Sequence, residues 1–196
     1  MLVHTIISAS NSNGPGMRFT LWVQGCSRRC KGCFNPQTWP LSGAGSYMSI
    51  KEITDLIPKK GIEGITVSGG EPFDQADELE ALLKEAHRRD LNTLVYTGYT
   101  YEQLCSNSYM QKALCQVDIL IDGPYKCDIK SHNIWTGSGN QHVYLLKNGI
   151  KSDDITDKNC ENPMLEIFID RFGTVSATGI PDIDFINTVH NNRRII

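Results

Sequence analysis

Three cysteines, Cys26, Cys30 and Cys33, lie within eight residues of this 196-residue chain, in the pattern C-x₃-C-x₂-C. Three thiolates on one tight loop can each bind one corner of a cuboidal iron–sulfur cluster. Electron-carrier clusters of this kind have four thiolate ligands, so a three-thiolate loop leaves one iron without a nearby protein ligand. An iron with an open position can bind a substrate or a cofactor, as catalytic metal sites do. The spacing therefore predicts chemistry at the fourth iron.

Two other kinds of site also use closely spaced cysteines. A zinc site would need a distant cysteine or histidine, and such sites more often pair one C-x₂-C with a second, which this sequence lacks. A disulfide framework is disfavoured because seven cysteines is an odd number and because residues 1–8 lack the charged start and long apolar core of a signal peptide. The iron–sulfur cluster is the preferred hypothesis, with a zinc site or a chance grouping of cysteines in a reduced protein as its alternatives.

A second candidate motif, Ser68-Gly69-Gly70-Glu71-Pro72, directly follows a predicted strand over residues 64–68. Two successive glycines leave the backbone uncovered, so that its edge can approach a ligand closely. A plain strand-to-helix turn would look similar, because this short motif is common. Its coexistence with the cysteine motif favours a ligand-binding role.

The cysteine pattern resembles the signature of the radical S-adenosylmethionine (SAM) superfamily. Its flanks, residues 13–18, 24–26 and 33–39, resemble those of glycyl-radical activating enzymes, and most closely the anaerobic ribonucleotide reductase activating enzymes. Two later segments, Ile121-Asp122-Gly123-Pro124 and residues 135–141, also resemble that family. Thr136 stands where the family pattern has arginine, so a basic contact is expected to be missing.

The resemblance implies a mechanism. Cys26, Cys30 and Cys33 would hold a [4Fe–4S] cluster whose open iron chelates the amino and carboxylate groups of SAM. One-electron reduction, by a flavodoxin-like or other low-potential reductant, would cleave SAM to methionine and a 5′-deoxyadenosyl radical. The expected substrate is a backbone glycine of a partner glycyl-radical enzyme such as anaerobic ribonucleotide reductase. The radical chemistry belongs to the cofactor, while the protein orients it and excludes water.

The resemblance also implies which residues bind SAM. The segment Gly69, Gly70 and Glu71 would bind its amino group. Many radical SAM loops carry an aromatic residue just before the third cysteine, where it contacts adenine. Here Gly32 takes that place and Phe34 follows the cysteine, which leaves the adenine contact open.

Two further residues are candidate SAM ligands because of where their strands end. Thr97 would hydrogen-bond the ribose or carboxylate of SAM, although a core strand end is nearly as good an explanation. Asp122 ends the following strand, at the edge where barrel-like α/β folds place their active sites.

Strands alternate with helices through the first two thirds of the chain, which predicts an α/β fold with a parallel sheet. The expected strands are residues 2–9, 18–24, 64–68, 92–97 and 117–121. The expected helices are residues 49–57 and 74–89, with one or two short helices over 101–114. Ser49 and Glu52 form a predicted capping box for the first helix. The repeats are too few for a complete barrel, so the resemblance and the length together predict a partial, open (β/α) barrel of the radical SAM type over residues 1–147.

After Pro124 the pattern changes to strands without helices. Residues 141–147, 164–170 and 174–178 read as strands, with a hairpin turn at 170–173 and a polar, turn-rich link at 148–163. Residues 148–196 are therefore predicted to form a small β-rich C-terminal extension that packs on the core.

The composition of the chain limits its expected partners and location. With 19 basic and 22 acidic residues the net charge is −3, which gives no general basic footprint for nucleic acid. No apolar run approaches the ~20 residues that span a bilayer, so we expect no membrane partner. A cytoplasmic location is expected, where thiols stay reduced.

Four other cysteines, Cys105, Cys115, Cys127 and Cys160, could bind an auxiliary cluster, but their gaps match no ligand spacing. Free cysteine often behaves as a small buried hydrophobe, and that is the preferred interpretation. The basic residues Arg28, Arg29 and Lys31 could steady a reduced cluster or meet an acidic partner. An ordinary solvated surface explains them equally well.

Two rival functions stay open at this point. A small radical SAM enzyme acting on a metabolite or peptide could use residues 148–196 for recognition. A non-catalytic iron–sulfur electron carrier would have no need of the amino-acid-binding segment Gly69–Glu71.

Overall fold

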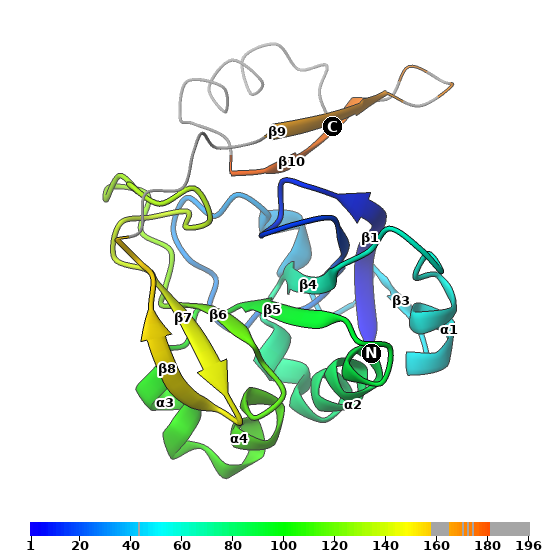
Figure 1. Ribbon diagram of the computed structural model, residues 1–196. Helices are drawn as coiled ribbons and strands as arrows, with labels where there is room; N and C mark the ends of the chain where they lie inside the picture. Colours follow the sequence, from blue (N-terminus) through cyan, green and yellow to red (C-terminus); the bar gives the residue numbers. More distant parts are fainter. Residues whose placement is uncertain (43, 158–164, 170, 172, 174, 181–196) are drawn as a thin grey trace.

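The computed structural model describes residues 1–42, 44–157, 165–169, 171, 173 and 175–180, and Figure 1 shows its architecture. Its main element is an eight-stranded mixed sheet in the order β3-β1-β2-β4-β5-β6-β7-β8. The strands are β1 (Leu2–Ser10), β2 (Arg18–Val23), β3 (Ser46–Tyr47), β4 (Gly64–Gly69), β5 (Asn92–Tyr96), β6 (Ile119–Asp122), β7 (His142–Lys147) and β8 (Ile150–Asp154). The predicted α/β class is confirmed.

Four central strands, β2, β4, β5 and β6, run parallel to one another. Their carboxyl ends therefore meet at one edge of the sheet, with Val23 of β2 beside Gly69 of β4. The outer pairs β1–β2, β1–β3, β6–β7 and β7–β8 are antiparallel. The strands that lead into the two sequence motifs, β2 and β4, therefore belong to the parallel, central part of the sheet.

Helices cover one face of this sheet. They are α1 (Ile50–Asp55), α2 (Ala76–His87), α3 (Tyr101–Ser106) and α4 (Ser108–Leu114), with short 3₁₀ turns η1 (Pro36–Thr38) and η2 (Pro72–Gln75). The amphipathic helix α2 buries Leu79, Leu82 and Leu83 in the main core together with strand residues such as Leu21. Each fully buried leucine stabilises the fold by roughly 2 kcal/mol. Helices α2–α4 lie together in the lower part of Figure 1.

The opposite face of the sheet carries a second, smaller core. Leu94, Ile119, Ile121, Val143 and Ile155 form it, with Tyr96 and Trp135 packed against them. Because side chains alternate along a strand, Leu94 enters this core while Val95 enters the helix-covered one.

Local sequence signals explain the helix starts. The Ser49 hydroxyl accepts a hydrogen bond from Glu52 N while the Glu52 carboxylate accepts one from Ser49 N, so the predicted capping box is confirmed. Thr100 and Gln103 form a second capping box, which the sequence reading did not identify. None of the helices that the structure describes is long and apolar enough to cross a bilayer.

The C-terminal part differs from its prediction in one element. The segment predicted as a polar link contains β8, which pairs with β7 across the tight turn at Asn148 and Gly149. Both residues have positive φ (51° and 76°), the geometry that suits a two-residue hairpin. The prediction failed because β8 is an exposed edge strand whose polar sequence, Ile150-Lys151-Ser152-Asp153-Asp154, lacks an apolar face.

A separate two-stranded sheet follows, formed by β9 (Leu165–Ile169) and β10 (Val175–Gly179). Both strands were predicted, and their antiparallel pairing agrees with the predicted hairpin, although residues 170 and 172 of its turn lie outside the described residues. The hairpin lies beyond the upper end of β1 in Figure 1. Its Glu166 accepts hydrogen bonds from Asn11 N (3.1 Å) and the Ser12 hydroxyl (3.0 Å).

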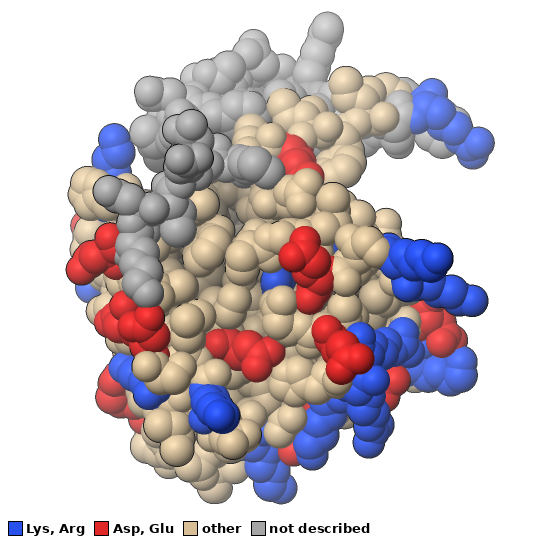
Figure 2. Space-filling view, viewed as in Figure 1, with Lys and Arg blue, Asp and Glu red and all other residues tan. Residues whose placement is uncertain are grey.

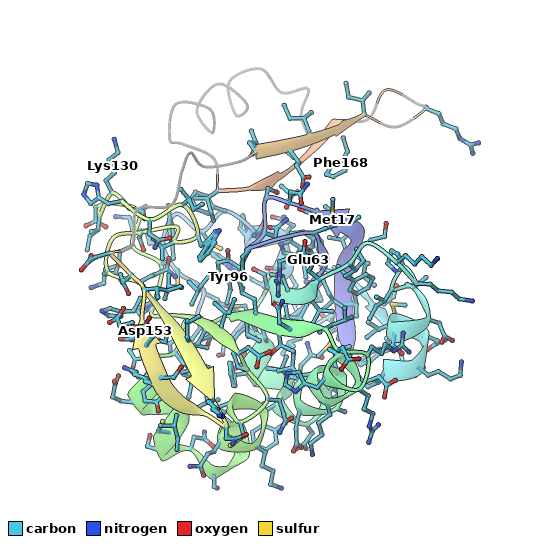
Figure 3. All side chains as sticks on the ribbon, in the orientation of Figure 1. Met17, Glu63, Tyr96, Lys130, Asp153 and Phe168 are labelled. Atoms are coloured by element: carbon cyan, nitrogen blue, oxygen red, sulfur yellow. The ribbon has the colours of Figure 1, made fainter. Side chains whose placement is uncertain are left out.

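Surface charge is mixed on the side of the molecule shown in Figure 2, where basic side chains gather at the lower right and acidic ones are scattered across the centre. Figure 3 labels two neighbours on this side, Met17 and Glu63, below Phe168 of β9. Met17 N donates a hydrogen bond to Glu63 Oε1 (3.1 Å), which joins the entry to β2 with the entry to β4.

Candidate functional site

A cavity of about 120 Å³ opens at the carboxyl ends of β2, β4 and β5. All three motif cysteines line it. Its other lining residues are Arg28, Trp39, Ser68, Gly69, Gly70, Glu71, Tyr96, Thr97, Gly98, Gly123, Tyr125 and Gln141. Two motifs that are separated by 35 residues (from Cys33 to Ser68) therefore share one hollow, as their places at the ends of parallel strands predict.

The cysteine loop is held at its base by backbone hydrogen bonds. Gly25 N donates to Thr38 O (2.7 Å) and Cys26 N donates to Trp39 O (3.2 Å), so the segment after η1 returns to the start of the loop. The chain turns at Arg29 (φ 46°) and Gly32 (φ 72°), both in the left-handed region. A non-glycine residue with positive φ is uncommon and marks a tightly constrained turn.

The three thiols are free and half-buried, and all three cysteines line the cavity. In the described part of the chain, no three His, Cys, Asp or Glu side chains are placed to hold a single metal ion. This arrangement suits a cuboidal cluster, in which each thiolate binds a different iron, better than it suits mononuclear zinc. Burial raises the pKa of Cys26, while backbone hydrogen bonds from Arg29 and Arg28 lower it.

Two donors at the cavity fit a sulfur-rich cofactor. Trp39 lines the cavity, and its buried indole Nε1 has no hydrogen-bond partner among the described residues. Asn35 N already donates to Cys33 Sγ (3.3 Å). Hydrogen bonds to ligand and bridging sulfurs are a normal part of the surroundings of iron–sulfur clusters.

The Gly-Gly-Glu segment contacts the cysteine loop directly. Gly70 N donates to Val23 O (2.9 Å) and Glu71 N donates to Gly25 O (2.9 Å). A Cβ atom on Gly70 would lie 2.0 Å from Gly25 O, and one on Gly69 (φ 103°) would lie 2.6 Å from Val23 N. Both glycines line the cavity, where their predicted binding of SAM stays a prediction, and their bare backbone also serves this loop-to-loop contact.

Glu71 is fully buried, with a relative exposure of 1%. Its carboxylate accepts hydrogen bonds from Phe73 N (3.0 Å), the Thr97 hydroxyl (2.8 Å) and Gly98 N (2.8 Å). Burial raises the pKa of Glu71 to about 7, although the three hydrogen bonds act in the opposite direction. Glu71 therefore joins the ends of β4 and β5 into one rigid wall of the cavity.

The remaining predicted cofactor residues occupy different positions. Thr97 lines the cavity, but its hydroxyl is engaged by Glu71 and by Tyr99 N (3.1 Å). Asp122 is buried behind the wall, where it accepts from Tyr101 N (2.6 Å) and bonds His142 Nδ1 (3.0 Å). It is not among the residues that line the cavity.

Phe34 is also outside the lining. Its ring packs on Tyr125, with ring centroids 4.7 Å apart, and Tyr125 is the residue that reaches the cavity. Thr136 is buried and forms a short hydrogen bond with the Ser131 hydroxyl, so this position makes no basic contact.

The sequence reading missed several lining residues, among them Tyr96, Tyr125 and Gln141. Gln141 Oε1 accepts from Gly137 N (2.9 Å) and Ser138 N (3.1 Å), and its Nε2 donates to Gly123 O (3.0 Å). Gln141 ends the family-like segment 135–141, so that motif contained a signal for its position. Tyr96 ends β5 one residue before Thr97, and the same strand-end argument would have found it.

The other described cysteines lie apart from one another. Cys105 packs against the main core, Cys115 lies beside Gly149, and Cys127 is exposed next to Gly32 of the cysteine loop. Cys160 lies outside the described residues. The half-buried Cys105 and Cys115 agree in part with the predicted role of small buried hydrophobes, whereas the exposed Cys127 does not.

The three basic residues of the cysteine loop lie in different surroundings. Arg28 lines the cavity, with its guanidinium 4.7 Å from the centre of the Tyr99 ring, whereas Arg29 and Lys31 are exposed. Asp74 fixes the loop just before Arg28, because it accepts from Ser27 N (2.8 Å) and the Ser27 hydroxyl (2.9 Å). The three residues therefore do not form one docking surface.

Comparison with known proteins agrees with this geometry. Residues 12–144 match the family described as "4Fe-4S single cluster domain". The anaerobic ribonucleoside-triphosphate reductase-activating protein of Enterobacteria phage T4 is 30% identical over 148 residues, covering 72% of this chain and 92% of that protein. The protein of the same name from Vibrio cholerae is 37% identical over 142 residues, covering 67% and 90%.

A third relative acts on a different enzyme. The pyruvate formate-lyase-activating enzyme of Staphylococcus epidermidis is 30% identical over 149 residues, which cover 72% of this chain and 59% of that enzyme. The cofactors of the site are a [4Fe–4S] cluster and SAM, as in activating enzymes of this kind. With its three-cysteine loop and Gly-Gly-Glu segment around one cavity, the chain belongs to the radical SAM family of glycyl-radical-activating enzymes.

Proposed function

We propose that this protein activates an anaerobic ribonucleotide reductase by generating a glycyl radical on it. The observation that carries the proposal is the shared cavity, in which three free thiols face the Gly-Gly-Glu segment. The choice of partner is supported by size as well as similarity. The matched region covers 92% and 90% of two reductase-activating relatives but 59% of the pyruvate formate-lyase-activating one.

Within the cavity, Cys26, Cys30 and Cys33 would hold the cluster. When SAM is bound beside it, one-electron reduction of the pair supplies a 5′-deoxyadenosyl radical that removes a hydrogen atom from glycine. The protein's own residues bind SAM and orient it. The backbone edge at Gly69 and Gly70 receives the SAM amino group, and Glu71 keeps that edge fixed through its bonds to β5.

Thr97, Phe34 and Asp122 have supporting parts in this proposal. Thr97 lines the cavity and contacts SAM beside its bond to Glu71. Phe34 supports Tyr125, which offers an aromatic face toward the cavity where adenine could stack. Asp122 anchors the start of α3 through Tyr101 N and so supports the wall from behind.

The sheet, in this proposal, is the partial, open (β/α) barrel of the radical SAM type, formed by residues 1–147. Residues 148–196 form the C-terminal extension packed on it, an arrangement supported by the bonds of Glu166 to the loop after β1. An incomplete barrel would leave room for a glycine-bearing loop of the partner. The protein would work in the cytoplasm with a flavodoxin-like or other low-potential reductant.

The direct experiment mixes anaerobically reconstituted protein with SAM, dithionite and the anaerobic ribonucleotide reductase of the same genome. A glycyl-radical doublet in the electron paramagnetic resonance spectrum is expected on the reductase, together with release of 5′-deoxyadenosine. The Cys30→Ala variant is the matched control and should yield neither product.

The rivals predict different results. Release of 5′-deoxyadenosine without any radical on the reductase would indicate another substrate, such as a metabolite, a peptide or pyruvate formate-lyase. Reversible oxidation and reduction of the cluster with no SAM cleavage would indicate an electron carrier.

A further inference from the structure

Arg28 is the only cationic side chain that lines the cavity among the described residues. It lies between two cluster ligands in sequence and beside Gly98 in space, where a Cβ atom on Gly98 would be 3.0 Å from Arg28 Cγ and 3.3 Å from Nε. The same Cβ would be 3.4 Å from Glu71 Oε2. Arg28 and Glu71 therefore approach Gly98 together, so that a cation and a carboxyl group stand at one wall of the cavity.

The guanidinium of Arg28 is held in place without being neutralised. It stacks on the Tyr99 ring at 4.7 Å, and Tyr99 is itself fixed by its hydroxyl bond to Asp74 (3.1 Å). Among the described residues, Arg28 forms no ion pair within 4.0 Å. By contrast, the other cavity-lining charge, Glu71, has three hydrogen-bond donors around it. The five N–H donors of an arginine side chain are well suited to a planar carboxylate.

The charges of SAM decide which of its parts can lie beside this group. SAM carries a sulfonium and an ammonium, both positive, and a single negative group, its carboxylate. A guanidinium close to either cation would be repelled in a partly buried cavity, where screening by water is weak. Among the charged groups of SAM, only the carboxylate is attracted to Arg28.

We propose that Arg28 binds the carboxylate of SAM and so makes the cavity specific for the amino-acid end of this cofactor. The proposal rests on the proposed function, in that SAM occupies this cavity. It deepens that function by assigning which part of the protein holds each of the two groups that the open iron would chelate, with the amino group at the Gly69–Gly70 edge and the carboxylate at Arg28. It also separates Arg28 from the exposed Arg29, which has the same side chain but does not line the cavity.

The test compares SAM with decarboxylated SAM, which keeps both positive groups and lacks only the carboxylate. Dissociation constants are measured by equilibrium dialysis on protein with an oxidised cluster, so that no cleavage occurs. In the Arg28→Gln variant we expect SAM to bind about 10- to 100-fold more weakly, as is typical when a charge-assisted hydrogen bond is lost. Decarboxylated SAM should bind the variant and the wild type within about twofold, because it never contacted Arg28.

Arg29→Gln is the matched control, with the same change of charge in the same loop, and should alter neither constant. Equal losses for the two ligands in Arg28→Gln would overturn the proposal, because Arg28 would then act through the cluster or the fold. An unchanged constant for SAM would overturn it as well. If wild-type protein with a full cluster bound neither ligand, the proposed function itself would fail.

A second measurement needs no variant, in case Arg28→Gln loses its cluster. Phenylglyoxal modifies arginine side chains, and mass spectrometry locates the modified residues. SAM should protect Arg28 from modification, whereas decarboxylated SAM should not, and Arg29 should react equally in all samples. Equal protection of Arg28 by both ligands would contradict the assignment.

Discussion

The two ends of the parallel strands both bury polar groups, and they differ in how far those groups are satisfied. At the amino ends, Arg18 is completely buried and donates to Thr66 Oγ1 (2.7 Å), Asn92 Oδ1 (2.7 Å), Ile65 O (2.7 Å) and Pro15 O (3.0 Å). Burial lowers the pKa of Arg18 to about 10, and no carboxylate forms an ion pair with it among the described residues.

At the carboxyl ends, by contrast, the polar groups keep unused bonding capacity. Three thiols are free, and within the described residues the Trp39 indole N–H has no partner and Arg28, stacked on the Tyr99 ring, forms no ion pair. A polar cluster whose donors and acceptors satisfy one another is structural, whereas one with donors and ligands to spare is built to receive a molecule. The comparison predicts that mutations at the amino ends lower stability and leave SAM binding intact, whereas mutations at the carboxyl ends impair the binding of the cofactors.

The largest effect is expected from the cluster ligands. Replacing Cys26, Cys30 or Cys33 with alanine should abolish the iron–sulfur cluster, because each thiolate binds its own iron. Chemical analysis after anaerobic reconstitution should find about four irons and four sulfides in wild-type protein and almost none in these variants. Alanine at Cys105, Cys115 or Cys127 should leave the iron content unchanged, and stoichiometric zinc in place of iron would refute the assignment.

Gly70→Ala should come next, because its Cβ would lie 2.0 Å from the carbonyl oxygen of Gly25 and must displace the cysteine loop. We expect a loss of about 2–4 kcal/mol in the free energy of unfolding and a markedly lower iron content. Gly61→Ala is the control, since nothing lies within 4 Å of its added atom, although Gly61, unlike Gly70, has a positive φ (79°).

That control should lose only about 1 kcal/mol through backbone strain and keep its full iron content. If Gly70→Ala retained wild-type iron and stability, the contact between the two loops would be unimportant.

Mutation at the amino ends should separate stability from function. Arg18→Met leaves five acceptors, Asn92 O (3.4 Å) among them, without this donor. It should lower the free energy of unfolding by about 3–5 kcal/mol in denaturant titrations. The fraction that remains folded should bind SAM as the wild type does. A variant that kept its stability but lost SAM affinity would place this end in the functional site and break the comparison.

Glu71 should give the carboxyl ends a distinctive pH dependence. Its pKa is about 4.5 in the unfolded chain and about 7 in the folded protein, so the folded state holds the proton more tightly. Stability should therefore be highest below about pH 4.5 for this group and fall as the pH rises to about 7, by at most roughly 3 kcal/mol.

Denaturant titrations of cluster-free protein across this range would measure the effect. The Glu71→Gln variant cannot ionise at this position, so its stability should lack this fall. Parallel curves for the two proteins would show that the buried carboxyl has an ordinary pKa.

The smallest effect concerns the exposed rim. Arg29→Glu should slow glycyl-radical formation on the partner about threefold to tenfold at low salt, because rim charges mainly change the rate of encounter. The difference should shrink as salt screens the charges, while 5′-deoxyadenosine release without partner stays unchanged. Lys59→Glu, an exposed lysine in the loop before β4, is the control and should have no effect; an equal defect there would exclude a local docking role for Arg29.

Sequence reasoning predicted the parts of this molecule that depend on local pattern. The cysteine spacing, the strand–Gly-Gly-Glu order and the capping box at Ser49 each carry their signal within a few residues, and parallel strands then bring the first two together. Local patterns say less where position depends on distant partners. Asp122 was predicted as a SAM ligand from its place at a strand end, and that role stays a prediction. Its side chain bonds Tyr101 N and His142 and does not line the cavity, and no local pattern indicates these partners.

Arg28 and Arg29 show the same limit of prediction from sequence, at two adjacent positions. They are identical and adjacent, yet one lines the cavity and the other is exposed. This difference in exposure arises from the two hydrogen bonds that Asp74 accepts from Ser27 and from the left-handed turn at Arg29. Neither feature can be read from the composition of the loop.

The contact between Gly70 and Gly25 also has a consequence for engineering. Because the carbonyl of Gly25 occupies the space of the missing Gly70 side chain, the shape of each loop is templated by the other. A chimera that takes the cysteine loop from one activating enzyme and the Gly-Gly-Glu segment from another would join surfaces that were never fitted together. The two segments are best transplanted as one cassette, together with Glu71 and the turn at Gly98 to which it is bonded.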